Sequence, residues 1–128
     1  MRDQRKLSVV RLALDLAVVV YRLTASFPAS ERYGLVDQMR RSAISVGSNI
    51  AEGAGRNGDR DFLRFVHIAY GSASELAFQL TIANSLGFGP ESERASVAES
   101  IDHLQRMLNR LAKRLKSGRT SAPGDHLA

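Results

Sequence analysis

Four stretches of the chain repeat apolar residues at steps of three and four, and this pattern limits the possible folds more than any other feature. They cover roughly residues 5–25, 31–52, 60–86 and 91–116. The last has the most regular seam, which ends at Leu115. Such steps place side chains on one face of an α-helix. Because no stretch shows the strict alternation of a strand, the sequence predicts an all-α chain.

Residues near the breaks predict where these helices begin and end. Ser30, and later Asn57 or Asp59, are suitable N-caps. Gly53 and Gly55 are typical of residues that follow a helix, and Gly87-Phe88-Gly89-Pro90 ends the third helical stretch. The connections between the four stretches are short, and short connections favour antiparallel neighbours. The predicted fold is therefore an antiparallel up-down-up-down four-helix bundle.

The length of 128 residues fits one domain with its own core. We expect the bundle to occupy residues 1–116. Residues 117–128 contain Gly, Pro and Ser without an apolar period, so we expect a disordered tail there. The chain has no cysteine, which excludes disulfides, thiol catalysis and thiolate zinc sites.

The first helical stretch is apolar around most of its circumference. Ser8, Arg11, Asp15 and Arg22 fall in one narrow polar stripe, and apolar residues cover roughly 260° of the wheel. A helix in an ordinary bundle needs an apolar stripe only a little over about 100° wide. The excess surface predicts burial against another subunit, so we expect the protein to be a homo-oligomer.

Basic residues outnumber acidic residues, and the predicted topology concentrates them. The chain has 18 Lys and Arg against 13 Asp and Glu, with a net charge of +5 and a pI near 10.2. In an up-down-up-down bundle the start of the first helix, the turn between the second and third, and the end of the fourth share one pole. The basic residues expected there are Arg2, Arg5, Lys6, Arg56, Arg60, Arg64, Arg110, Lys113, Arg114, Lys116 and Arg119. The acidic residues expected there are fewer, namely Asp3, Glu52, Asp59, Asp61 and Asp125.

Concentrated positive charge of this kind suits the binding of a polyanion. The candidates for contact with nucleic-acid phosphates are Arg56, Arg60, Arg64, Arg110, Lys113 and Arg114. Because the chain has no Trp and only 6% aromatic residues, we expect binding of RNA or DNA to be directed at phosphates and sensitive to salt. The alternative is a solvated charged surface that complements the dipole at the end of the fourth helix.

Five polar residues lie within or beside the apolar stretches of the second and third helices, namely Arg40, Arg41, Asn49, Glu52 and Glu75. A buried carboxylate needs a partner, and arginine is the usual one. We expect these residues to form a buried or half-buried network with a structural role. General acid–base catalysis is the alternative, but the sequence offers no nucleophile, metal site or second tuned group. We therefore predict that the protein is not an enzyme.

Two motifs resemble ligand sites but lack the context that such sites need. Residues 53–58 match GxGxxG, yet a helix rather than a strand precedes them, so they predict a helix end and a turn. Glu99 and His103 lie one helical turn apart, whereas a di-iron bundle needs Glu-x-x-His twice and two further Glu residues. We expect no cofactor and no metal.

The start of the chain superficially resembles a secretion signal, because Arg2, Arg5 and Lys6 precede an apolar stretch. Arg11 and Asp15 interrupt that stretch, and no small-residue cleavage site follows cleanly. No run of 18 apolar residues exists, so no membrane-spanning helix is expected. We expect a cytoplasmic protein without a membrane partner.

The second and third helical stretches carry a family signature. Its residues are Phe27-Pro28, Glu31, Tyr33-Gly34-Leu35, Gln38, Arg40-Arg41, Ala43, Ser45, Asn49-Ile50-Ala51-Glu52-Gly53, Gly55-Arg56, Phe62, Phe65, Ala69, Gly71-Ser72 and Glu75-Leu76. The sequence closely resembles the bacterial four-helix-bundle family named for proteins encoded in 23S rRNA intervening sequences. The resemblance covers about residues 7–115, and one departure is Gly47, where relatives often carry Pro.

This resemblance implies a homopentameric barrel of antiparallel bundles. The family includes the accessory variability determinant of diversity-generating retroelements, which partners a reverse transcriptase and binds nucleic acid. Most members have no established activity, and the family name describes where some of the genes lie. The implied partners are therefore copies of the same chain, RNA or DNA, and another protein such as a reverse transcriptase.

These observations favour a non-enzymatic oligomeric scaffold or adaptor that binds nucleic acid through its basic pole. The alternative is a purely structural oligomer that binds another protein and has no role with nucleic acid. A steep dependence of nucleic-acid binding on salt would distinguish the first function from the second.

Overall fold

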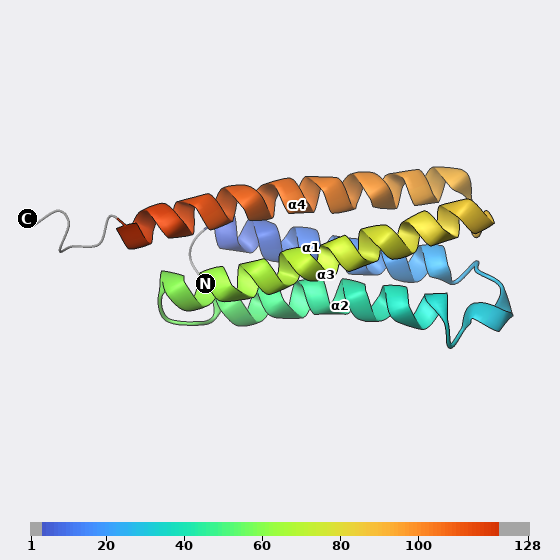
Figure 1. Cartoon of the computed structure of the whole chain (residues 1–128), viewed down its shortest axis with the longest axis horizontal. Coiled ribbons are helices and arrows are strands. Elements are labelled where there is room, and N and C mark those ends of the chain that lie inside the picture. Colours follow the sequence, from blue (N-terminus) through green and yellow to red (C-terminus); the bar gives the residue numbers. More distant parts are fainter. Residues whose placement is uncertain (1–3, 121–128) are drawn as a thin grey trace, which may run out of the picture.

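The computed structural model describes the backbone of residues 4–120 and the side chains of residues 6–118. Its elements are α1 (Gln4–Thr24), the short 3-10 helix η1 (Ala29–Glu31), α2 (Leu35–Ala54), α3 (Asp59–Leu86) and α4 (Glu91–Thr120). Each long helix runs antiparallel to the next along the chain (Figure 1). The described residues form no strand, and the predicted all-α, up-down-up-down bundle is confirmed.

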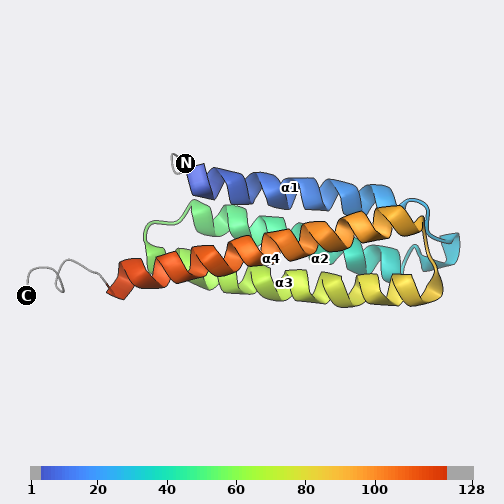
Figure 2. The ribbon, with the colours of Figure 1, turned by 90° about the horizontal axis from the view of Figure 1, so that it is seen from above.

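The four helices pack as a square in which chain neighbours are also spatial neighbours. α2 contacts α1 and α3, and α4 contacts α3 and α1, so α1 and α3 lie diagonally opposite (Figure 2). The start of α1, the turn between α2 and α3, and the end of α4 all lie at one end of the bundle (Figure 1). The topology thus brings together the helix ends that carry most of the basic residues.

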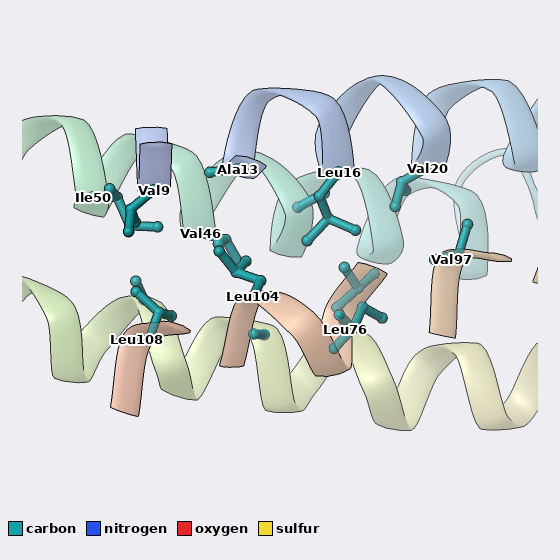
Figure 3. Packing of buried hydrophobic residues seen from close by; sticks show 14 of the residues in the cluster. Val9, Ala13, Leu16, Val20, Val46, Ile50, Leu76, Val97, Leu104 and Leu108 are labelled. Carbon is teal, nitrogen blue, oxygen red and sulfur yellow. The ribbon is translucent and has the colours of Figure 1, made fainter. Parts of the chain in front are cut away.

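Apolar side chains from all four helices fill the space between them. Val20 of α1, Val46 of α2, Leu76 of α3, and Leu104 and Leu108 of α4 are fully buried and point toward one another (Figure 3). Val46, Leu76, Leu104 and Leu108 were expected on the core face from their spacing in the sequence, whereas Val20 was not singled out. Burial of one such side chain contributes roughly 1.5–3 kcal/mol, so this core is the main source of stability.

Small side chains let α2 approach α3 closely. The hydroxyls of Ser45 of α2 and Ser72 of α3 form a hydrogen bond of 2.8 Å. Gly53 of α2 faces Phe65 of α3, and a Cβ on Gly53 would lie only 2.6 Å from Cβ of Phe65. Helix separation depends on the size of the side chains at the contact, so these small residues hold the two axes near each other.

The start of α2 differs from the sequence prediction. Ser30 was expected to be its N-cap, but Ser30 lies in η1 and α2 begins only at Leu35. The backbone N–H of Leu35 donates to a carboxylate oxygen of Glu31 at 3.2 Å. Glu31 therefore satisfies one of the free donors of the first turn, and its negative charge also stabilises the positive end of the helix dipole.

Two glycines with positive φ bound α3. Gly58, at φ 107°, occupies the N-cap position instead of the predicted Asn57 or Asp59. Gly87, at φ 69°, ends the helix in the left-handed conformation, as the sequence predicted. The N–H of Phe88 then donates to the carbonyl of Ala83 at 3.0 Å. A residue with a side chain adopts these dihedral angles only with strain.

The loop between α3 and α4 is held by a buried arginine. Arg94 is only 9% exposed. Its guanidinium donates to the Asn84 side chain at 2.7 Å and to the carbonyl oxygens of Phe88 and Gly89. A positive charge at the C-terminal end of α3 also complements the helix dipole.

The end of α4 lies further along the chain than predicted. The helix continues to Thr120, four residues into the segment that was expected to be a disordered tail. The expected disorder is therefore wrong for residues 117–120, while the last core residue of α4 is Leu115. The remainder of that tail, residues 121–128, lies outside the described residues.

The close contact between α2 and α3 predicts that Gly53→Ala is destabilising. A Cβ on Gly53 would lie 2.6 Å from Cβ of Phe65 and 2.9 Å from Cδ1 of Phe62, so the helices must move apart. We expect the free energy of unfolding to fall by about 1–3 kcal/mol, measured by urea denaturation.

Gly47→Ala is the matched control on the same helix. Its added Cβ would lie 3.7 Å from the Ala13 methyl, an ordinary contact. Alanine is the better helix former, so this variant should be more stable by about 0.5–1 kcal/mol. Equal stabilisation by both substitutions would contradict the close packing at Gly53.

Candidate nucleic-acid interface

The six predicted phosphate-binding residues are all exposed in the half of the bundle that ends at the basic pole. Arg56 follows α2, and Arg60 and Arg64 lie on the first turns of α3. The other three are on the last turns of α4, namely Arg110, Lys113 and Arg114. We use "basic pole" for these six residues together with Lys6 and Lys116, whose placement is described below.

An aromatic ring brings two of the arginines together. Phe65 is buried against α2, and the guanidinium carbons of Arg64 and Arg56 lie 4.5 Å and 5.2 Å from its ring centroid. Arg56 belongs to the α2–α3 turn and Arg64 to α3, so the ring joins residues from both sides of the turn. Cation–π contacts at exposed sites contribute about 0.5–1 kcal/mol each, which limits the freedom of both side chains.

Arg56 differs from the other candidates in its charge environment. Its guanidinium forms an ion pair with Glu52 at 3.0 Å. Within the described part of the chain, no carboxylate lies within ion-pair distance of Arg60, Arg64, Arg110, Lys113 or Arg114. These five cations are therefore not neutralised by a direct ion pair, although Asp59 and Asp61 line shallow depressions with some of them. A surface with an excess of cations attracts anions.

Two shallow depressions add residues to the six phosphate candidates. The first lies between α3 and α4, where Arg60, Asp61, Arg64 and His67 meet Lys116. The second is lined by Lys6 of α1, by Asp59 and Phe62 of α3, and by Arg114 of α4. Lys6 and Lys116 were expected at this pole from the sequence, and the arrangement of the helices shows that they line two different depressions.

The structure therefore divides the candidate set. Arg56, Arg60 and Arg64 gather around the turn, and Lys116 joins them across the groove. Arg114 lies on the side of α4 that faces α1, with Lys6, as the second depression shows. Arg110 and Lys113 are on the exposed outer surface of α4. The basic pole is thus a broad surface with two shallow depressions rather than one closed pocket.

The predicted polar network does not form among the residues that the structure describes. Arg40 donates to the Thr24 hydroxyl at 2.9 Å and stacks over Tyr21, whereas Arg41 pairs with Asp37 at 3.2 Å.

The remaining three members of that network are also separate. Asn49 donates to the carbonyl of Ser45 at 2.8 Å, Glu52 pairs with Arg56, and Glu75 is exposed on α3 without an ion pair to any described residue. The helical period predicts on which face of its helix each residue lies. It does not predict the distances between residues, and the five residues form separate contacts instead of one network.

The other motifs have no visible ligand geometry in the described residues. Residues 53–58 form the end of α2 and the turn before α3, so a helix precedes the glycines. Glu99 and His103 are exposed along the groove between α1 and α4. Among residues 4–120, no three His, Cys, Asp or Glu side chains are grouped so that they could hold a metal ion. None of the described helices is long and apolar enough to cross a membrane.

Comparisons with known proteins agree with the fold. A family model described as "23S rRNA-intervening sequence protein" matches residues 5–110. No curated protein matches the chain. One similar solved structure is a crystal structure, at 1.70 Å resolution, of a protein of unknown function from the S23 ribosomal protein family of Bacteroides thetaiotaomicron VPI-5482. It is 20% identical with a TM-score of 0.75, and the match covers 85% of this chain and 98% of that chain.

The exposed position of Glu52 predicts a small effect of Glu52→Gln on stability. Exposed ion pairs one helical turn apart contribute about 0.3–0.5 kcal/mol, so the free energy of unfolding should fall by no more than about 0.5 kcal/mol in urea denaturation.

Asp37→Asn, which removes the similar pair with Arg41 at the other end of α2, is the matched control and should behave alike. A loss above about 2 kcal/mol for Glu52→Gln alone would place Glu52 in a buried network after all.

Proposed function

Since the chain belongs to the 23S rRNA-intervening sequence protein family, we propose that it is a non-enzymatic scaffold that assembles with copies of itself and binds nucleic acid through its basic pole. The observation that carries this proposal is the group of exposed cations at one end of the bundle. Arg60, Arg64, Arg110, Lys113 and Arg114 have no carboxylate partner among the described residues. Nucleic acid is the common polyanion whose charge density matches such a surface.

Contact with phosphates rather than bases is the expected mode of binding. The aromatic rings of this region, Phe62 and Phe65, are buried in the bundle and present no platform to a base. Arginine forks and lysine ammonium groups bind phosphate oxygens through charge-assisted hydrogen bonds. Binding of this kind reads little sequence and depends strongly on salt.

Self-assembly would multiply this surface. α1 leaves Leu7, Leu14, Val18 and Tyr21 partly exposed, as its wide apolar surface predicted. Exposed apolar side chains that gather in one stripe are typical of interaction sites. If the subunits are arranged around an axis parallel to the helices, the basic poles form one ring, and the family resemblance favours five subunits in it.

A second candidate function is a structural oligomer that binds another protein, such as a reverse transcriptase, without nucleic acid. The observation in its favour is the same set of exposed apolar side chains, which a protein partner could cover instead of another subunit. The two functions differ in whether the basic pole is needed for binding.

Charge reversal tests the proposed function. The variant Arg60→Glu, Arg64→Glu and Lys113→Glu removes three exposed cations of the basic pole without altering the core. We expect its affinity for labelled duplex DNA or structured RNA at about 50 mM salt to fall by at least about 100-fold, because each lost phosphate contact also removes counterion release. Fluorescence anisotropy measures the affinity, and the melting temperature should change little.

The control Ser30→Glu, Arg32→Glu, Arg41→Glu and Ser92→Glu changes the net charge equally at exposed positions in the other half of the bundle. It should retain most of the affinity.

The wild-type protein, with six phosphate contacts, should lose roughly 10³-fold in affinity between about 50 and 200 mM salt. Equal losses in the charge-reversal variant and its control, or no binding by the wild type at low salt, would refute binding at this pole.

A further inference from the structure

Two separate apolar faces are exposed on the bundle. We name the first the α1–α2 face, which consists of Leu14, Val18 and Tyr21 of α1 and Ile44 of α2. The second, the α3 face, consists of Ile68, Phe78 and Leu86, with the half-buried Ile82 between the last two. Leu14 is 54% exposed and Phe78 is 67% exposed. Leaving such side chains in water is unfavourable, so both faces are candidates for contact with a partner.

The two faces lie on either side of α2. α1 packs against α2 where Ala13 meets Gly47, and α3 packs against α2 through the Ser45–Ser72 hydrogen bond. On a helical wheel, each exposed stripe lies on the outer side of its own helix and leans toward α2. The exposed surface of α2 between them is mainly polar, with Arg41, Ser48 and Glu52. The faces are therefore distinct surfaces that point in different directions.

The apolar residues of the two faces lie at matching heights along the bundle. Heights on α1 and α3 can be compared through α2, because Ala13 of α1 lies beside Gly47 and Ser72 of α3 lies beside Ser45. With a rise of about 1.5 Å per residue, Leu14 and Ile68 differ in height by about one helical turn or less. The hydrogen bond from Arg40 to Thr24 fixes the other end of α1.

The same comparison places Tyr21 and Arg22 within about one turn of the height of Glu75 and Phe78. Because α1 and α3 run in the same direction (Figure 1), a copy rotated about an axis parallel to the helices keeps these heights.

The charges at the two faces are also complementary. Arg22 borders the α1–α2 face, and Glu75 lies within the α3 face. Both are exposed, and neither is paired with an oppositely charged side chain among the described residues. Contact of either face with a copy of itself would oppose like charges, whereas contact between different faces brings Arg22 toward Glu75. Repulsion between like charges therefore disfavours contact of a face with a copy of itself.

We propose that the α1–α2 face of one subunit binds the α3 face of the next copy of this chain. This inference deepens the self-assembly in the proposed function and rests on it. Such a head-to-tail contact repeats until it closes into a ring. Because the two faces lie on either side of α2, both neighbouring copies lie toward the α2 side of a subunit. α2 therefore lines the inside of the ring. α4 then faces outward with Arg110 and Lys113, and all basic poles point to one side.

Mixing two variants tests this pairing directly. Leu14→Glu disables the α1–α2 face and leaves the α3 face intact, whereas Phe78→Glu does the reverse. Each variant alone should be monomeric. An equimolar mixture should form a 1:1 heterodimer that grows no further, because only one pair of intact faces exists. Native mass spectrometry resolves the two variants by mass, and circular dichroism checks that both remain folded.

Ala95→Glu on the exposed outer surface of α4 is the control and should assemble like the wild type. If the two face variants are folded but their mixture stays monomeric, or if either variant alone assembles fully, the pairing is wrong. A monomeric wild type would instead overturn the self-assembly in the proposed function. The two failures are therefore distinguishable.

A charge exchange provides a milder test that leaves the apolar residues in place. Arg22→Glu and Glu75→Arg should each raise the dissociation constant of the assembly about tenfold, because each places like charges across the contact. The double variant restores opposite charges between neighbouring copies and should recover to within about threefold of the wild type. Additive losses in the double variant would contradict contact between these two residues.

Discussion

The close packing of α2 against α3 is the constraint on which the rest of the structure depends. Gly53 leaves no room for a Cβ beside Phe65, and the Ser45–Ser72 hydrogen bond lies in the same interface. This contact fixes the turn between the helices and holds the Phe65 ring at the end of the bundle. Arg56 and Arg64 stack on that ring. A packing constraint in the core thus determines where charge appears on the surface.

The bundle separates its surfaces by chemistry. Apolar side chains are exposed along α1 and α3, on either side of a polar α2, whereas cations gather at one end and along the last turns of α4. Assembly through the apolar faces would leave the cations free and align them on one side. Multiple weak phosphate contacts in one assembly give a higher total affinity than any single subunit, which connects oligomerisation with nucleic-acid binding.

The sequence predicted the fold well, because core residues such as Leu76, Leu104 and Leu108 repeat with the helical period. It failed where structure depends on contacts between elements. Ser30 is a good N-cap by composition, yet Glu31 performs that role from a 3-10 turn. Glu75 was expected in a polar network but is exposed. Helical periodicity predicts the face on which a residue lies, but it does not predict the distance to residues on other helices. Arg94 is buried and donates to a loop carbonyl, a contact that helical periodicity does not predict.

Native mass spectrometry of the wild-type protein with a short nucleic-acid duplex tests the central claim most directly, because one spectrum reports both subunit number and bound ligand. The account predicts a single homo-oligomer that keeps its subunit number when it binds the duplex at low salt, and that releases the duplex as salt rises. A monomer, or an oligomer that carries no nucleic acid at low salt, would contradict it.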